Sequence, residues 1–123
     1  MVGQWSDDVL LGGFGPDYVR GSGGHDRVGG GQGTDWVLGS RGNDLLRGGH
    51  AEDLVRGSEG QDQAWPGPGP DVVILGSGDD LVTLAPDGQA DDVECAGGAD
   101  TVALIGEADP LDSFTDCEQT EVK

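Results

Sequence analysis

Apolar residues recur along this chain at every ninth position from Leu10 to Val82. The recurring residues are Leu10, Val19, Val28, Val37, Leu46, Val55, Ala64, Val73 and Val82. Each is the middle residue of a three-residue stretch, and in a strand the middle residue points to one face while its two neighbours point to the other. The pattern therefore predicts a series of short strands, each of which places one apolar side chain inside.

An aspartate lies two residues before each of these apolar residues, and glycines precede the aspartate. The nine aspartates are Asp8, Asp17, Asp26, Asp35, Asp44, Asp53, Asp62, Asp71 and Asp80. The repeat has the form G-G-x-G-x-D-x-U-x, where U is apolar, and residues 30–38 are one clear copy. We number its positions 1 to 9, with aspartate at position 6. Glycine adopts positive φ freely, so the glycine-rich half predicts tight turns.

Six-residue turns that alternate with three-residue strands predict a coil and not a series of hairpins, because every turn carries the same pattern. Two repeats, or 18 residues, complete one coil, and successive coils stack as parallel strands about 4.8 Å apart. Alternate repeats then lie on the same flank. One column of aspartates begins at Asp8 and the other at Asp17.

Over residues 3–83 this motif resembles the RTX (repeats-in-toxin) calcium-binding nonapeptide. The resemblance implies an all-β fold, a right-handed parallel β-roll, with several Ca²⁺ ions in the turns on both flanks. It also implies that the nine position-6 aspartates are the metal ligands, and Asp17 with Asp35 and Asp26 with Asp44 belong to the most complete turns. The alternative is that these aspartates only cap solvated turns.

The register slips after Thr83, so we expect a roll over residues 1–83 and a cap over residues 84–123, within one continuous domain. The count resumes at Asp91, Asp100 and Asp109, followed by Val93, Val102 and Leu111. This ending resembles that of secreted actinobacterial members of the family. Cys95 and Cys117 are expected to form a disulfide worth roughly 3 kcal/mol, with two free buried thiols as the alternative. A disulfide indicates an oxidising compartment, which favours a secreted protein.

Composition alone would suggest an unfolded chain. Glycine accounts for 25 of 123 residues and the formal net charge is −18, so self-repulsion opposes folding and a cation is needed. The acidic surplus argues against nucleic acid as a partner. No apolar run approaches the roughly 20 residues of a membrane span, and no signal peptide is recognisable. No Ser-His-Asp or Cys-His constellation is apparent. We therefore expect a non-catalytic extracellular module that folds on binding calcium.

The outward positions of the strands suggest alternative functions. One predicted ladder of outward side chains consists of Tyr18, Trp36, Leu54 and Val72. Its apolar character indicates either a homodimer or protein-partner face or ordinary cross-strand pairing. An ice-binding solenoid would need a regular threonine ladder, which Thr34, Thr83 and Thr101 do not form. His25 and His50 are expected to be exposed turn residues and not zinc ligands.

Overall fold

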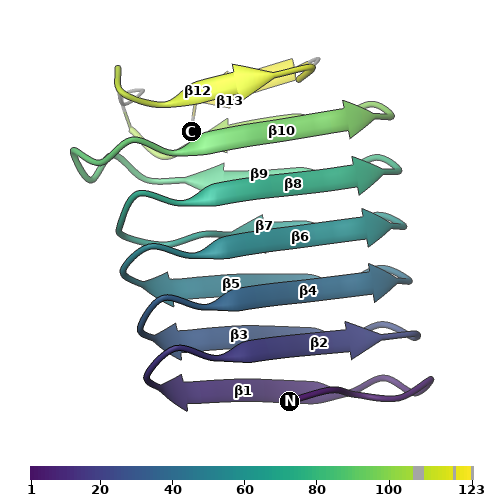
Figure 1. Ribbon diagram of the computed structural model, residues 1–123. Coiled ribbons are helices and arrows are strands. Elements are labelled where there is room, and N and C mark those ends of the chain that lie inside the picture. Colours follow the sequence, from purple (N-terminus) through teal and green to yellow (C-terminus); the bar gives the residue numbers. More distant parts are fainter. Residues whose placement is uncertain (107–109, 118, 123) are drawn as a thin grey trace.

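The computed structural model describes residues 1–106, 110–117 and 119–122 and contains thirteen strands over these ranges. All their pairings are parallel, and they form two facing sheets (Figure 1). The seven-stranded sheet has the order β1-β3-β5-β7-β9-β11-β13 and the six-stranded sheet β12-β10-β8-β6-β4-β2. The strands are β1 (Val9–Phe14), β2 (Tyr18–Ser22), β3 (Arg27–Gln32), β4 (Trp36–Arg41), β5 (Leu45–His50), β6 (Leu54–Glu59), β7 (Gln63–Trp65), β8 (Val72–Ser77), β9 (Leu81–Leu84), β10 (Asp92–Gly97), β11 (Thr101–Leu104), β12 (Ser113–Thr115) and β13 (Gln119–Val122).

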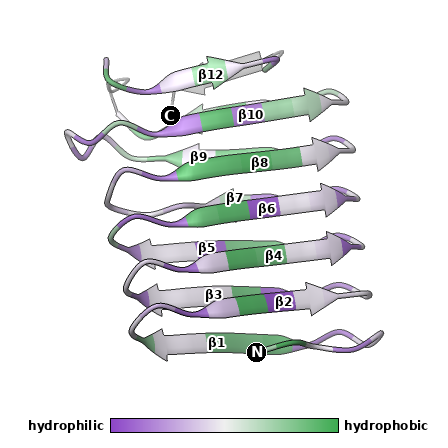
Figure 2. Ribbon diagram, viewed as in Figure 1, coloured by the Kyte–Doolittle hydropathy of each residue, from purple (hydrophilic) through white to green (hydrophobic). Residues whose placement is uncertain are grey.

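Each strand pairs with the strand of the same sheet one coil away, which confirms the parallel β-roll and the stacking of alternate repeats. In the register, Val19 pairs with Val37 and Val37 with Val55. The position-8 residues from Val19 to Val82 are at most 2% exposed and fill the space between the sheets. Hydrophilic residues gather in the turns and hydrophobic ones in the strands (Figure 2). Among the described residues there is no helix of the length and hydropathy needed to cross a membrane.

The expected division into three-residue strands and six-residue turns is wrong. Most strands have five or six residues because the strand pairing continues into positions 1 to 3 of the next repeat. Position 1 points inward like position 8, so a strand such as β4 contributes two buried residues, Val37 and Gly39. The backbone adopts positive φ at position 2, as at Gly31, and again at position 4, as at Gly33. The turn proper is therefore short.

The apolar filling changes along the roll. At position 1 the first repeats have glycine, whereas later coils place Leu75, Leu84, Cys95 and Leu104 inside, each at most 4% exposed. These residues join the position-8 ladder in one core cluster. In the C-terminal coils, apolar side chains are therefore buried at both position 1 and position 8. In the N-terminal coils they are buried at position 8 only. Strands β10 to β13 extend the same two sheets. The boundary between roll and cap at residue 84 stays a prediction.

Candidate metal centre

The position-6 aspartates form two continuous hydrogen-bonded columns, one in each row of turns. In every step the Oδ1 atom of one aspartate accepts a hydrogen bond from the backbone N–H of the aspartate one coil earlier. The N–H of Asp26 donates to Asp44 at 2.9 Å, and the N–H of Asp17 donates to Asp35 at 2.8 Å. The same bond recurs through Asp62 and Asp80 in one column and through Asp53 and Asp71 in the other.

The second carboxylate oxygen has no such partner. In eight of these aspartates the Oδ2 atom is buried and accepts no hydrogen bond; they are Asp17, Asp26, Asp35, Asp44, Asp53, Asp62, Asp71 and Asp80. The residues from Asp26 to Asp80 are at most 3% exposed. A buried carboxylate oxygen without a donor is costly to desolvate, so each of these eight atoms marks a place where a positive charge would be stabilised.

Asp8 differs from the other eight. Its Oδ2 atom accepts a hydrogen bond from the Gln4 N–H at 2.9 Å, and its Oδ1 atom accepts one from the Ser6 hydroxyl at 3.0 Å. The side chain is half-buried at the end of the roll. The structure therefore offers a weaker reason for a cation at Asp8 than at the other predicted ligands.

Position 1 is glycine for a reason that the sequence analysis missed. A Cβ atom added at Gly30 would lie 2.5 Å from the Oδ2 atom of Asp35 and 2.7 Å from the carbonyl oxygen of Gly48 in the next coil. At Gly12 it would lie 2.7 Å from Asp17 Oδ2 and 2.6 Å from the Gly30 carbonyl oxygen. Neither glycine has positive φ. Space beside the carboxylate, and not backbone conformation, requires glycine here.

Position 4 follows the expected rule of positive φ. Its glycines, among them Gly33 and Gly42, have φ of +124° and +107°. A Cβ atom at Gly42 would contact the carbonyl oxygen of Gly24 one coil earlier. Ala51 occupies the same position with φ of 78°, a conformation that is unfavourable for a residue with a Cβ atom. Carbonyl oxygens of neighbouring coils therefore line the turns together with the carboxylates.

These oxygen atoms fit calcium. Ca²⁺ takes six to eight oxygen ligands and mixes carboxylates with backbone carbonyls. Within the described ranges, no group of three or more His, Cys, Asp or Glu side chains gathers as a metal site by itself. A cation in these turns consequently needs main-chain oxygens beside the aspartates, which suits calcium better than zinc, because zinc prefers nitrogen and sulfur side-chain ligands.

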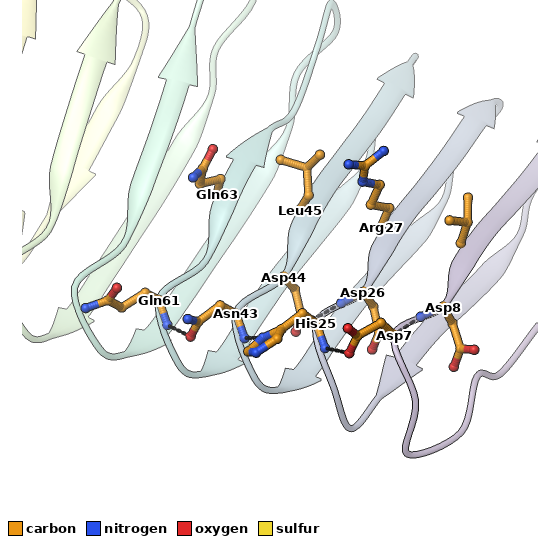
Figure 3. A pocket seen from close by; sticks show the side chains of 11 residues that line it. Asp7, Asp8, His25, Asp26, Arg27, Asn43, Asp44, Leu45, Gln61 and Gln63 are labelled. Carbon is orange, nitrogen blue, oxygen red and sulfur yellow. Dashed lines mark hydrogen bonds between the residues drawn. The ribbon is translucent and has the colours of Figure 1, made fainter.

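A second ladder of acceptors runs along the outside of one row of turns, at position 5 (Figure 3). The His25 N–H donates to Asp7 Oδ1 at 2.8 Å, the Asn43 N–H to His25 Nδ1 at 2.9 Å, and the Gln61 N–H to Asn43 Oδ1 at 2.8 Å. The side chain at position 5 is polar, and either short or planar, in each repeat of this row. The sequence analysis overlooked this pattern. His25 is exposed, and its Nδ1 atom serves as an acceptor in this ladder. The expectation of an exposed turn residue is confirmed for His25.

Burial raises the pKa of six of the column aspartates, which are Asp26, Asp44, Asp53, Asp62, Asp71 and Asp80. Desolvation raises the pKa of Asp44 and Asp53 to about 6, that of Asp62 to about 7 and that of Asp71 to about 8. Neighbouring carboxylates of the same column raise these pKa values further, while the backbone N–H donor lowers them. Without a cation, folding places these carboxylates where their ionisation costs more free energy than it does in water.

This electrostatic cost predicts that acid orders the calcium-free protein. The pKa of an unfolded aspartate is about 3.9, so between about pH 4 and pH 8 the folded chain binds more protons than the unfolded one. Its stability without calcium therefore falls as the pH rises through this window. In excess chelator, far-UV circular dichroism is expected to show more β-structure at pH 5 than at pH 7.5. At saturating calcium the direction reverses, because protons then compete with the cation. An ion-free protein that loses structure between pH 7.5 and pH 5 would contradict this account.

The columns continue beyond the predicted ligands. The N–H groups of Asp71 and Asp80 donate at 2.9 Å to the Oδ1 atoms of Asp91 and Asp100, across 20 residues and not 18. The N–H of Asp91 then donates to Asp112 at 3.0 Å. The predicted continuation at Asp109 and Leu111 is not the register found, because Phe114 pairs with Val93 and Leu111 is exposed. Asp109 itself lies outside the described residues.

The expected disulfide between Cys95 and Cys117 is present and spans 22 residues, with the two Cα atoms 5.0 Å apart. Cys95 is fully buried in β10, and Cys117 packs against the same core cluster. The bond therefore attaches the chain after β12 to the apolar end of the roll. It closes the side of the molecule opposite to the open first coil.

Comparison with known families bears on the repeat itself. The family model described as the RTX calcium-binding nonapeptide repeat (4 copies) matches residues 2–37 and 29–64, more than half of the chain. The chain belongs to the RTX repeat family. This family is a structural calcium-binding repeat, which supports calcium binding by this RTX roll. A search of curated proteins returned no match.

Proposed function

We propose that this RTX chain is a non-catalytic extracellular module that binds several Ca²⁺ ions between the coils and folds on binding them. The observation that carries the proposal is the set of eight buried Oδ2 atoms without hydrogen-bond donors in a chain of net charge −18. Stacked carboxylates repel one another in a medium of low dielectric constant. Divalent cations between the coils remove that repulsion.

The ligands in this proposal come from two sources. Successive position-6 aspartates of one column, such as Asp26 and Asp44, supply carboxylate oxygens. Carbonyl oxygens at positions 1 and 4, such as those of Gly21 and Gly24, supply the remainder. The first coils are the best candidates because glycine at position 1 leaves space beside the carboxylate. Where Leu75 replaces glycine before Asp80, an apolar side chain enters the core at the same position.

Folding and binding are then one process. Without calcium, the charge repulsion and the conformational freedom of glycine oppose the ordered chain. With calcium, the free energy of binding adds to the free energy of folding. Extracellular modules bind calcium with dissociation constants of roughly 10⁻⁴–10⁻³ M, and the disulfide is compatible with that compartment.

A calcium titration tests the proposal. Chelator-treated protein at pH 7.5 is expected to have a largely disordered far-UV spectrum and to gain β-structure as calcium is added. Magnesium at the same concentration and ionic strength is the control, since it demands a rigid octahedral site and keeps its water. Equal order in excess chelator and in calcium would disprove coupled folding.

The outward aromatic ladder supports a second proposal, that one sheet face binds a partner or a second copy of the chain. The predicted register is found: Tyr18 pairs with Trp36, Trp36 with Leu54 and Leu54 with Val72. Tyr18, Trp36 and Val72 are 44%, 53% and 38% exposed. The rings of Tyr18 and Trp36 lie 6.3 Å apart, so cross-strand pairing also accounts for part of the ladder.

An ice-binding surface is not supported. Thr101 pairs with Leu81 and Thr83 pairs with Ala103, so the two threonines occupy different ladders. Thr34 lies in a turn of the other row.

A further inference from the structure

The outer face of the six-stranded sheet carries two ladders without carboxylates over four coils. Its carboxylate at the end of β6, Glu59, is paired with Arg41. The outward positions of β2, β4, β6 and β8 form two adjacent ladders, which contain Tyr18, Trp36, Leu54, Val72 and Arg20, Leu38, Arg56, Ile74. None of these eight residues is acidic, although the chain has 24 Asp and Glu residues. Two of its five arginines lie here. The two ladders are thus cationic from β2 to β8, and the next strand, β10, continues them with Asp92 and Glu94.

Arg20 and Arg56 lie on either side of Leu38. Arg20 pairs with Leu38 and Leu38 with Arg56 in the register, so their backbones are about 10 Å apart, twice the strand spacing. Neither guanidinium has a carboxylate within 4 Å among the described residues, where Arg41 with Glu59 is the ion pair found. The Nε atom of Arg20 donates to the Ser40 hydroxyl at 3.0 Å, which leaves the two outer nitrogens of the guanidinium as further donors.

A groove of about 360 Å³ lies between these side chains. It is lined by Tyr18, Arg20, Leu38, Ser40, Arg41, Arg56, Ser58 and Glu59. The floor at Leu38 is apolar, the two ends are cationic, and the turn side carries two hydroxyl groups. A ligand for this groove needs a planar anionic group, an apolar ring face and hydroxyl groups.

We propose that this groove binds the carboxylate of an acidic saccharide. Guanidinium groups hold carboxylates through paired N–H donors, and the two arginines can do so from opposite sides. The sugar ring then lies over Leu38 and the Tyr18 ring, and the hydroxyls of Ser40 and Ser58 are partners for its hydroxyl groups. Glu59, the carboxylate that lines the groove, is paired with Arg41, so Arg20 and Arg56 are left to bind the ligand. At physiological ionic strength the Debye length is about 8 Å, so the turn carboxylates farther away are screened. Binding requires the folded roll, whatever drives its folding.

The other sheet provides a matched control. Arg27 and Arg47 lie on the outer face of the seven-stranded sheet, in different ladders, because Arg27 pairs with Leu45 and Gly29 pairs with Arg47. The Arg47 guanidinium lies 5.6 Å from the centre of the Trp65 ring. These two arginines carry the same charge as Arg20 and Arg56. They differ because they do not belong to one ladder with a single residue between them.

The experiment measures binding by isothermal titration calorimetry at 0.15 M salt, with protein shown to be folded by circular dichroism. The probes are a hyaluronan tetrasaccharide, which contains glucuronate, the neutral cellotetraose and inorganic phosphate. The variants are R20Q/R56Q and R27Q/R47Q. The tetrasaccharide is expected to bind wild type and R27Q/R47Q within twofold of each other and to bind R20Q/R56Q at least tenfold more weakly. Cellotetraose and phosphate are expected to bind at least tenfold more weakly than the tetrasaccharide.

Three results would overturn the proposal. The first is the absence of tetrasaccharide binding to folded wild type. The second is an equal loss in both double variants, which would show a general charge effect. The third is phosphate or cellotetraose binding as tightly as the tetrasaccharide, since the groove would then recognise any anion or any sugar. Folding without calcium would disprove coupled folding but leave this measurement intact, so the two proposals fail separately.

Discussion

Replacing Asp44 by asparagine is expected to raise the calcium concentration for half-maximal folding by tenfold or more, equivalent to about 1.4 kcal/mol or more. Asp44 is 3% exposed, its Oδ1 atom accepts the Asp26 N–H, and its Oδ2 atom has no donor. Asparagine keeps an oxygen acceptor for the Asp26 N–H but removes the charge. The substitution is therefore expected to weaken calcium binding while the hydrogen bond within the turn is kept.

The same substitution is expected to have the opposite effect without calcium. Desolvation raises the pKa of Asp44 to about 6, so in chelator at pH 7.5 the fold must bury an ionised group. The D44N protein avoids this cost and should be more ordered than wild type in chelator. Circular dichroism across a calcium titration measures both effects. The control is E52Q, which removes one charge from an exposed turn residue. Equal midpoints for D44N and wild type would contradict a ligand role for Asp44.

Loss of the Cys95–Cys117 disulfide is expected to lower the free energy of unfolding by about 3 kcal/mol, from the entropy of a loop of 22 residues. The measurement is urea unfolding at saturating calcium. C117S tests the bond while Cys95, which is fully buried, keeps its packing in the core. C95A/C117S removes that packing too and should be less stable than C117S. A loss below about 1 kcal/mol in C117S would show that the cross-link contributes little.

This loss should be concentrated at one end of the molecule. The disulfide joins coils in which Leu75, Leu84 and Leu104 already enlarge the apolar core, so those coils depend less on calcium than the glycine-rich ones near Gly21 and Gly30. Hydrogen exchange in chelator is expected to show slower exchange in β8 to β11 than in β2 to β5 in wild type. The difference should shrink in C117S.

The sequence predicted the roll because its period is strict where the core requires it. Val19, Val37 and Val55 recur at 18 residues, and in the structure these residues pair directly. The two aspartate columns were predictable for the same reason, because alternate repeats lie on the same flank of the roll. The outward ladder that begins with Tyr18 and Trp36 was also predictable, because the alternation of faces in a strand is fixed.

Other features depend on three-dimensional contacts that the period does not contain. Glycine at position 1 reads like a turn residue, yet Gly30 is needed because Asp35 Oδ2 and the Gly48 carbonyl lie beside it. The column continues to Asp112 and not to Asp109 because the coil after Asp91 contains 21 residues. The groove between Arg20 and Arg56 arises from two residues 36 positions apart, which alternate with Leu38 in the stack.

The most direct test of the central claim is to locate the cations. Crystals grown at millimolar calcium should give anomalous difference peaks inside both rows of turns, between successive position-6 aspartates such as Asp26 and Asp44 or Asp17 and Asp35. Each peak should lie within about 2.3–2.6 Å of an aspartate Oδ2 atom and of main-chain carbonyl oxygens. The account is contradicted if these turns contain no peak, or if calcium is found only at exposed carboxylates such as Glu52.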